Sequence, residues 1–300
     1  MNKYISSFCD EFKYPAEAKA TLISAYETLS LNYDASELFH RYVKLYNEDR
    51  LNDYKAVLHD LDTAADLSSV HKYTLHLLFF ICLSKHTREL YEKKGISYEI
   101  YYDSMSDLKW KLIECYTMYE IWGTFVPGWY DRFFDLTRFA LGRLQFEIIN
   151  FKDFYDKGNY SLKENDVVLN IHIPSCGPML HDECITSYRK AASFYKDYFV
   201  GRPVAFVCSS WLLFPRHKEF LPKNSNVLKF MEDFDIYSYT IDKDGSDLWR
   251  IFYKDYRNAP ADLPQKTSIQ RAYADWLMKG NPIGTGKGVF FFDGENILKN

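Results

Sequence analysis

Apolar residues recur at helical spacing through roughly the first 140 residues of this 300-residue chain. Leu22, Tyr26 and Leu29, for example, lie three or four positions apart, which places them on one face of a helix. Stretches of this kind predict helices at residues 15–29, 34–46, 73–83 and 104–119. Asp34 is the expected cap of the second of these helices. The first half of the chain is therefore predicted to be a helical bundle.

The period of the apolar residues becomes two after Leu141, as expected for strands. In residues 144–148 every second residue is apolar. Residues 167–173 alternate in the same way, so that Asn170 and His172 share one face of the predicted strand. A Pro-Gly turn at 174–178 follows, and this order of strand, turn and helix is where α/β proteins tend to place ligands.

The remaining elements of the second half follow from the same patterns. We expect helices at residues 182–198, 225–234 and 267–280, and strands at 205–213, 237–241, 248–253 and 289–292. The two predicted strands at 237–241 and 248–253 are expected to pair across the turn at 243–245. Alternating helices and strands make this half α+β or α/β. The predicted fold class is α+β, with a helical domain at 1–138 and a domain with a mixed central sheet at 139–300.

Composition narrows the class of protein. The chain is 47% hydrophobic and 26% charged, which is usual for a globular protein, and its net charge of −4 argues against a surface for nucleic acid. The longest apolar run, residues 77–83, is too short to span a membrane. The first residues lack the features of a signal peptide, and six scattered cysteines are typical of thiols in a reducing compartment. We therefore expect a cytoplasmic protein with no membrane partner.

Four residues between positions 172 and 184 have side chains that bind zinc: His172, Cys176, His181 and Cys184. Their spacing matches no common zinc module, so no metal site is predicted. Cys176 is also a candidate nucleophile with a neighbouring histidine as base, but no cysteine-hydrolase signature surrounds it. A small residue in a tight turn is the simpler interpretation.

Two motifs near the C-terminus suggest ligand binding. Residues 284–288, Gly-Thr-Gly-Lys-Gly, are not a P-loop, because such a loop follows a strand and ends in Lys and then Ser or Thr. A connecting loop is predicted here, with closure on a ligand as the alternative. Thr267 and Gln270 form a capping box, which gives Gln270 a structural role and leaves Arg271 to face a ligand.

A polar face of the predicted sheet is the best candidate for a site. Residues 143, 145 and 147, together with Asn170 and His172, come from separate strands. Either Cys208 and Ser210 or Ser209 and Trp211 join them from a third strand. If these strands are neighbours, the residues form one patch, and Glu147 or His172 is the candidate general base. The alternative is a face that is simply solvated.

At these residues the chain resembles a bacterial two-domain acyltransferase-like family. The resemblance is carried by residues 141–147, 172–174, 177–178, 210–213, 224–226 and 267–272. Members of this family pair a helical N-terminal domain with a C-terminal domain of GNAT (N-acetyltransferase) type. The resemblance covers most of residues 135–300 and extends to the helical half by architecture alone.

The resemblance implies a GNAT-like fold and direct transfer of an acyl group from acyl-coenzyme A (acyl-CoA), as co-substrate, to an amine on a small-molecule acceptor. The helical domain is expected to shape the acceptor pocket. Catalysis is assigned to Glu147 and His172. Binding of acyl-CoA is assigned to a strand end, the loop after it and three further positions: Asn170, Ile173, Pro174, Ser175, Gly177, Ser210, Trp211 and Arg271.

One part of the family pattern is missing. The usual pyrophosphate loop has Gln or Arg, two residues, and then Gly-x-Gly or Gly-x-Ala, whereas residues 175–179 read Ser-Cys-Gly-Pro-Met. Pro178 supplies no amide hydrogen, and Asp182, as the expected helix cap, would repel an anion. The alternative function is therefore a non-catalytic small-molecule-binding protein that retains the GNAT-like fold.

Overall fold

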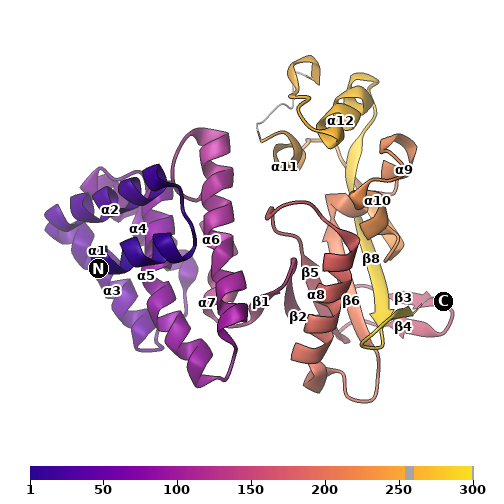
Figure 1. Ribbon diagram of the computed structural model, residues 1–300, viewed down its shortest axis with the longest axis horizontal. Coiled ribbons are helices and arrows are strands. Elements are labelled where there is room, and N and C mark those ends of the chain that lie inside the picture. Colours follow the sequence, from indigo (N-terminus) through magenta and orange to yellow (C-terminus); the bar gives the residue numbers. More distant parts are fainter. Residues whose placement is uncertain (254–259, 299–300) are drawn as a thin grey trace. The chain divides into compact units, whose positions relative to one another are not determined.

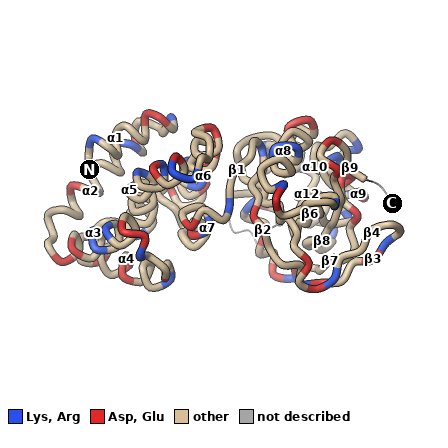
Figure 2. The backbone as a smooth tube through the Cα atoms, turned by 90° about the horizontal axis from the view of Figure 1, so that it is seen from below, with Lys and Arg blue, Asp and Glu red and all other residues tan. Residues whose placement is uncertain are grey.

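The computed structural model describes residues 1–253 and 260–298. The chain consists of two compact units, Met1–Ala140 and Leu141–Asn300 (Figure 1). Charged residues of both signs alternate along both units, and neither carries a continuous basic stripe among its described residues (Figure 2).

The first unit is helical, as predicted. Its helices are α1 (Asn2–Glu11), α2 (Ala16–Leu31), α3 (Tyr33–Asn47), α4 (Tyr54–Ser68), α5 (Lys72–Lys93), α6 (Tyr98–Tyr119) and α7 (Asp131–Phe134), with a 3-10 turn η1 (Pro127–Trp129) before α7. Residues 74–84 of α5 are all buried, so this helix forms the centre of the bundle. The expected cap at Asp34 is wrong. Asn32 caps α3 instead, because its side chain accepts a hydrogen bond from the amide of Ala35 at 3.0 Å.

The second unit is built on a mixed sheet with strand order β1-β2-β5-β6-β8-β7, and β9 pairs with β8. The strands are β1 (Arg138–Leu141), β2 (Leu144–Asn150), β5 (Val167–His172), β6 (Val204–Ser210), β7 (Asp235–Asp242), β8 (Ile283–Phe292) and β9 (Ile297–Leu298). β5 and β6 are parallel, whereas β2–β5, β6–β8 and β7–β8 are antiparallel. This confirms the predicted mixed sheet and places the strands of the polar patch side by side.

Helices cover one face of this sheet. They are α8 (His181–Phe194) and α10 (Asn226–Met231). Phe206 of β6 stacks on Phe290 of β8 with ring centroids 4.8 Å apart, and Tyr188 of α8 packs against both rings. Burial of such large aromatic side chains is the main stabilising contribution on this face.

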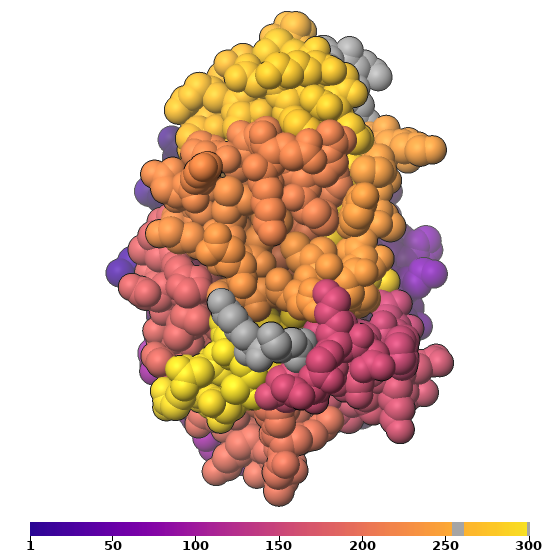
Figure 3. Space-filling model, turned by 90° about the vertical axis from the view of Figure 1, so that its right-hand side faces the viewer, coloured from indigo at the N-terminus to yellow at the C-terminus, as the bar shows by residue number. Residues whose placement is uncertain are grey.

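The opposite face is covered only in part. The hairpin of β3 (Tyr155–Lys157) and β4 (Tyr160–Leu162) packs on an apolar cluster that includes Val168, Val207 and Val289. Tyr160 stacks on Phe291 at 4.6 Å, so the hairpin and the end of β8 lie close together (Figure 3). The polar ends of the strands lie beyond this cluster.

The rest of the second unit consists of short helices: 3-10 turns η2 (Lys196–Tyr198), η3 (Trp211–Leu213) and η4 (Pro260–Asp262), and α-helices α9 (His217–Phe220), α11 (Leu248–Phe252) and α12 (Ser268–Met278). The predicted strand at 248–253 is therefore wrong. Leu248, Ile251 and Phe252 are buried at helical spacing, three and four residues apart. β7 pairs with β8 instead of with this segment.

The glycine-rich segment 284–288 is also not a loop, because it lies inside β8. A Cβ atom on Gly286 would lie 2.0 Å from the carbonyl oxygen of Leu213, and one on Gly284 would lie 2.3 Å from that of Thr240. Glycine is required here because two other backbones approach β8 too closely for a side chain.

Candidate active site

Glu147, Asn170 and His172 form a hydrogen-bonded cluster on β2 and β5. The register places Glu147 opposite Asn170, and Gln145 opposite His172. His172 Nε2 lies 2.7 Å from Glu147 Oε1, and Asn170 Nδ2 lies 3.0 Å from His172 Nε2 and 3.4 Å from Glu147 Oε1. Glu147 and His172, which the sequence assigned to catalysis, are therefore in direct contact with each other and with Asn170, which it assigned to binding.

The Glu147 carboxylate is well shielded, since only 8% of the residue is exposed. A carboxylate only accepts hydrogen bonds, so the 2.7 Å contact is a hydrogen bond when Nε2 carries the proton, and in that state the Asn170 amide donates to Glu147 Oε1 and not to Nε2. In this state a proton taken up by the ring produces an imidazolium that Glu147 stabilises. The pair therefore has the arrangement of a carboxylate-assisted general base.

The cluster lies on the partly covered face of the sheet. Asn170 and His172 alternate with buried residues and share this face with Val168, which belongs to the apolar cluster. On β6 the same face carries Val207 and, two residues on, the exposed Ser209. The sequence offered two pairs for the third strand, Cys208 with Ser210 and Ser209 with Trp211. The structure places Ser209, from the second pair, on this face.

Ser210 and Trp211 lie elsewhere at the end of β6. The alternation of β6 places Ser210 on the helix side of the sheet, where its side chain accepts a hydrogen bond from the amide of Leu212 at 3.2 Å and caps η3. Trp211 is the first residue of η3 and packs edge-on against Tyr273 at 6.0 Å.

β5 and β6 are paired over only part of their length. Among the described residues, the parallel register joins Leu169 to Phe206 and Asn170 to Val207. β5 continues to His172 paired with β2, and β6 continues to Ser210 paired with β8. Where the pairing between β5 and β6 ends, β5 is still paired with β2 and β6 is still paired with β8. The Glu147 cluster lies beside this point of separation.

The loop after β5 is held by Arg143, which lies in the turn between β1 and β2 and not on a strand face as expected. Its guanidinium donates hydrogen bonds to the carbonyl oxygens of Pro174 at 2.9 Å, Gly177 at 2.9 Å and Pro178 at 3.2 Å. Ser175 and Gly177 are exposed and Pro174 is buried. The backbone of this loop is therefore ordered by one side chain from a distant part of the sequence.

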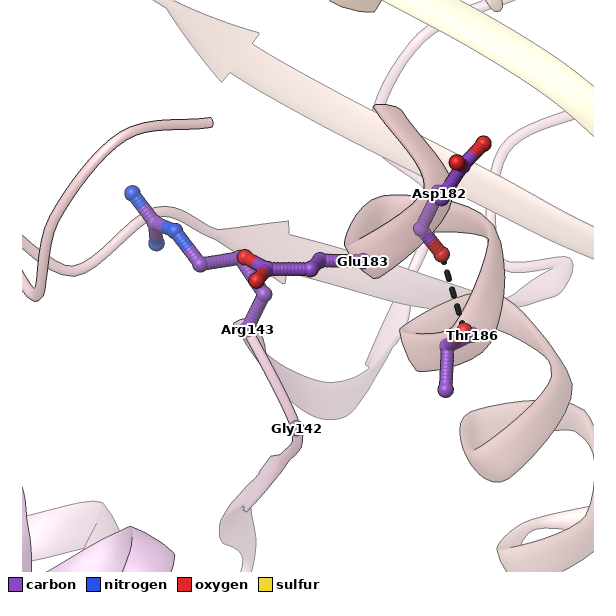
Figure 4. Close-up of a pocket in the computed structure, with 5 residues that line it drawn as sticks. All are labelled: Gly142, Arg143, Asp182, Glu183 and Thr186. Atoms are coloured by element: carbon purple, nitrogen blue, oxygen red, sulfur yellow. Dashed lines mark hydrogen bonds between the residues drawn. The ribbon is translucent and has the colours of Figure 1, made fainter. Parts of the chain in front are cut away.

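The helix after the loop begins one residue earlier than predicted, at His181, and within the described residues no side chain caps it. The expected cap at Asp182 is wrong. Asp182 and Glu183 lie in the first turn and, with Gly142, Arg143 and Thr186, line a cavity of about 420 Å³. In Figure 4, Glu183 extends toward Arg143, whereas Asp182 points away from it.

His181 has a partner that the sequence did not reveal. Its Nε2 lies 2.8 Å from Oδ1 of the buried Asp233, whose Oδ2 accepts a hydrogen bond from Tyr188 at 3.1 Å. Burial raises the pKa of the Asp233 carboxyl above its ordinary value. This contact fixes the first turn of α8 to the end of α10. His181 is thus not placed as a base for Cys176, whose thiol lies 3.9 Å from the carbonyl oxygen of Arg143.

Asp153, Lys287 and Tyr237 form a hydrogen-bonded group on the partly covered face that was not predicted from the sequence. Asp153 accepts hydrogen bonds from Lys287 at 2.8 Å and from Tyr237 at 2.9 Å. The hydrogen bond from Lys287 is the main reason that the pKa of Asp153 is lowered. Lys287 lies opposite Ser209 in the register, on a strand where a loop had been expected.

Gln270 and Arg271 lie at the start of α12. The capping box between Thr267 and Gln270 is present, which confirms the structural role of Gln270. Arg271 donates hydrogen bonds to the carbonyl oxygens of Gln265 at 3.0 Å and Lys266 at 3.2 Å. It is exposed, but its guanidinium is engaged with the segment before its own helix.

Metal ligands and membrane spans were sought along the described residues. No group of three or more His, Cys, Asp or Glu side chains in residues 1–253 and 260–298 is arranged to hold a metal ion. Over the same residues, no helix combines the length and the apolar character needed to cross a membrane.

Solved structures with this architecture are acyltransferases. One, in complex with decanoyl-CoA and teicoplanin, has 20% sequence identity and a TM-score of 0.73 over 95% of this chain and 87% of its own. Another, a mutant acyltransferase in complex with octanoyl-CoA, has 20% identity and a TM-score of 0.71 over 94% of this chain and 86% of its own. At this identity the likeness establishes the fold.

Comparison with family models identifies both units. No curated protein sequence matches the chain. An N-acyltransferase N-terminal domain matches residues 3–136, and a GNAT-like C-terminal domain matches residues 138–290. The chain therefore belongs to the family of acyltransferase-like proteins that join an N-acyltransferase N-terminal domain to a GNAT-like C-terminal domain.

Proposed function

We propose that this protein is an acyltransferase that moves an acyl group from acyl-CoA to an amine on a small-molecule acceptor by direct attack. The observation that carries this proposal is the Glu147–His172 pair beside the point where β5 and β6 separate. The domain is GNAT-like, and the solved relatives of this fold are described in complex with decanoyl-CoA, octanoyl-CoA and, in one case, teicoplanin.

In the proposed reaction the neutral acceptor amine attacks the thioester carbonyl carbon and forms the new C–N bond. His172 takes the proton that the amine loses, and Glu147 stabilises the resulting imidazolium. The C–S bond then breaks, and the departing sulfur takes up the proton held by the His172 imidazolium, so that coenzyme A leaves as the thiol. The products are an amide and free coenzyme A, and no covalent enzyme intermediate forms.

Binding of acyl-CoA is assigned to the end of β5 and the loop after it, and to residues on β6, η3 and α12. These residues are Asn170, Ile173, Pro174, Ser175, Gly177, Ser210, Trp211 and Arg271. The exposed backbone of Ser175 and Gly177 suits contact with a ligand's phosphate or amide groups. Arg271 needs a further step, because it must release its two carbonyl partners to reach an anion.

Calorimetry with coenzyme A and decanoyl-CoA tests the binding half of the proposal. The chemistry is tested by mass spectrometry of a panel of amine acceptors incubated with decanoyl-CoA and the protein. We expect micromolar to millimolar binding and an acceptor mass increased by one acyl group. Absence of binding at millimolar ligand would refute the proposal.

A specific observation favours the non-catalytic alternative. Pro178 removes one amide from the loop, and Asp182 and Glu183 give the first turn of α8 a negative charge that opposes a pyrophosphate. This alternative predicts a bound small molecule without transfer. Binding of coenzyme A with no acylated product from any amine would support it over the enzyme.

A further inference from the structure

We propose that Arg143 is the positioning residue of the ligand loop, defined here as residues 173–179, and that it turns an amide hydrogen of this loop, that of Ser175, outward toward bound acyl-CoA. This role rests on the proposed function, because it assigns a purpose to the same binding site. It concerns a residue of the β1–β2 turn, which lies about 30 positions before the loop in the sequence.

The first step is the direction of the loop carbonyls. Three of them, from Pro174, Gly177 and Pro178, converge on the guanidinium of Arg143 at 2.9–3.2 Å. Each of the three guanidinium nitrogens donates to a different carbonyl. The fixed planar fork of arginine makes this possible, whereas a lysine ammonium on a flexible stem offers no such geometry.

The second step follows from peptide geometry. The peptide bonds of the loop are trans, and in a trans peptide the C=O and N–H groups point in opposite directions. Since the carbonyls of Pro174 and Pro178 point to Arg143, the amides of Ser175 and Met179 point away from it. Within the described part of the chain, neither amide donates to a backbone carbonyl. Ser175 is exposed whereas Met179 is buried, so the amide of Ser175 is the donor that a ligand can reach.

The third step is the placement of Arg143 itself. Its amide donates to Ser187 Oγ on α8 at 2.9 Å, which fixes the turn to the helix that follows the loop. Gly142 allows this approach, because its φ is +82° and a Cβ there would meet Ser187 Oγ at 3.0 Å. Arg143 is therefore anchored to α8 through its backbone while it orders the loop through its side chain.

This arrangement accounts for the missing Gly-x-Gly pattern. A loop whose carbonyls are gathered by a guanidinium does not need several glycines to expose an amide. Pro178 fits the same scheme: it has no amide hydrogen, but its carbonyl is one of the three acceptors.

The test compares Arg143→Lys, which keeps the charge but loses the fork, with Arg143→Gln, which loses both. Arg189→Lys on α8 is the matched control, because Arg189 is an exposed arginine paired with Glu295. Two quantities are measured: the Kd for coenzyme A by calorimetry, and the rate at which iodoacetamide modifies Cys176 without ligand, which reports the order of the loop. Circular dichroism confirms that each variant is folded.

We expect Arg143→Lys and Arg143→Gln to weaken coenzyme A binding about equally, by about tenfold, which corresponds to roughly 1.4 kcal/mol. Both should also speed modification of Cys176 several-fold, with Arg189→Lys unchanged in both measurements. Wild-type affinity in Arg143→Lys with a loss only in Arg143→Gln would overturn the proposal, because charge alone would then explain binding. Unchanged affinity in both variants would overturn it too. No binding by the wild-type protein would instead refute the proposed function, and this role with it.

Discussion

At the scale of single residues, the contact between Glu147 and His172 gives the clearest test of the mechanism. Glu147→Gln replaces a buried carboxylate with a neutral amide, so the imidazolium formed during transfer loses its stabilising charge. We expect kcat to fall by roughly 10²–10⁴-fold, the usual contribution of a general base, with little change in the Kd for coenzyme A. His172→Ala should have a similar effect. Steady-state kinetics and calorimetry measure the two quantities.

Glu232→Gln is the control for this pair, since Glu232 is exposed at the end of α10. It should keep wild-type kcat. If Glu147→Gln and His172→Ala also kept it, neither residue would be the base. A loss of binding with normal kcat would assign the cluster to ligand binding instead.

The buried residue His217 should make the free energy of unfolding depend on pH. It is fully buried and hydrogen-bonded to Tyr273, and burial lowers its pKa from 6.5 to about 4. Between these values the unfolded chain binds a proton that the folded protein does not, so stability falls as pH falls from about 6.5 to about 4. The loss from this group is up to about 3 kcal/mol.

Urea unfolding at pH 7 and pH 4.5 measures this contribution, with His217→Gln as the comparison. The variant keeps an acceptor for the Tyr273 hydroxyl but has no group that titrates. Its free energy of unfolding should therefore fall less between the two pH values than that of the wild-type protein. Equal losses in both proteins would show that His217 is not responsible.

At the scale of elements, helices and strands are predicted best from the sequence where one face of the element is buried. β5 was predicted because its apolar residues alternate, and the helices of the first unit because theirs recur every three or four positions. Residues 248–252 were misassigned because a segment of five residues shows either period equally well. The strand predicted at 289–292 is the end of β8, but its first part was missed because glycines occupy 284, 286 and 288, and the reason for them, the approach of Leu213 and Thr240, is a tertiary contact.

The same reasoning explains what was missed in the site. Glu147, Asn170 and His172 were found because they occupy the polar positions of alternating segments that form neighbouring strands. Asp233 and Asp153 could not be found, because their partners lie 52 and 134 positions away in the sequence, at His181 and Lys287. Only the folded sheet brings such residues together.

Gly286 gives a test of the packing of β8. In Gly286→Ala the new methyl group would lie 2.0 Å from the carbonyl oxygen of Leu213, so the strand or η3 must shift. We expect a loss of about 1–3 kcal/mol in the free energy of unfolding, as is usual for overpacking. Gly128→Ala is the control, because a Cβ there would meet no atom within 4 Å. Urea unfolding compares both variants, and equal stability would contradict the close approach.

At the scale of the whole molecule, the six cysteines are distributed over both units, so the reactivity of their thiols tests the packing of both. Five are buried, and burial raises the pKa of each thiol to about 12: Cys9, Cys82, Cys115, Cys184 and Cys208. Cys176 is partly exposed and lies in the ligand loop. Since the thiolate is the reactive form, Cys176 should be the one thiol that iodoacetamide modifies rapidly in the native protein.

Intact mass after timed exposure to iodoacetamide measures this reactivity. One rapid modification is expected in the native protein and six in guanidinium chloride, because unfolding exposes every thiol. Decanoyl-CoA, whose own sulfur is blocked as a thioester, should slow the native modification if it covers the loop. Two or more rapid modifications would contradict the burial of the other five thiols. An unchanged rate with saturating decanoyl-CoA would instead separate Cys176 from the ligand, and it would do so without depending on catalytic activity.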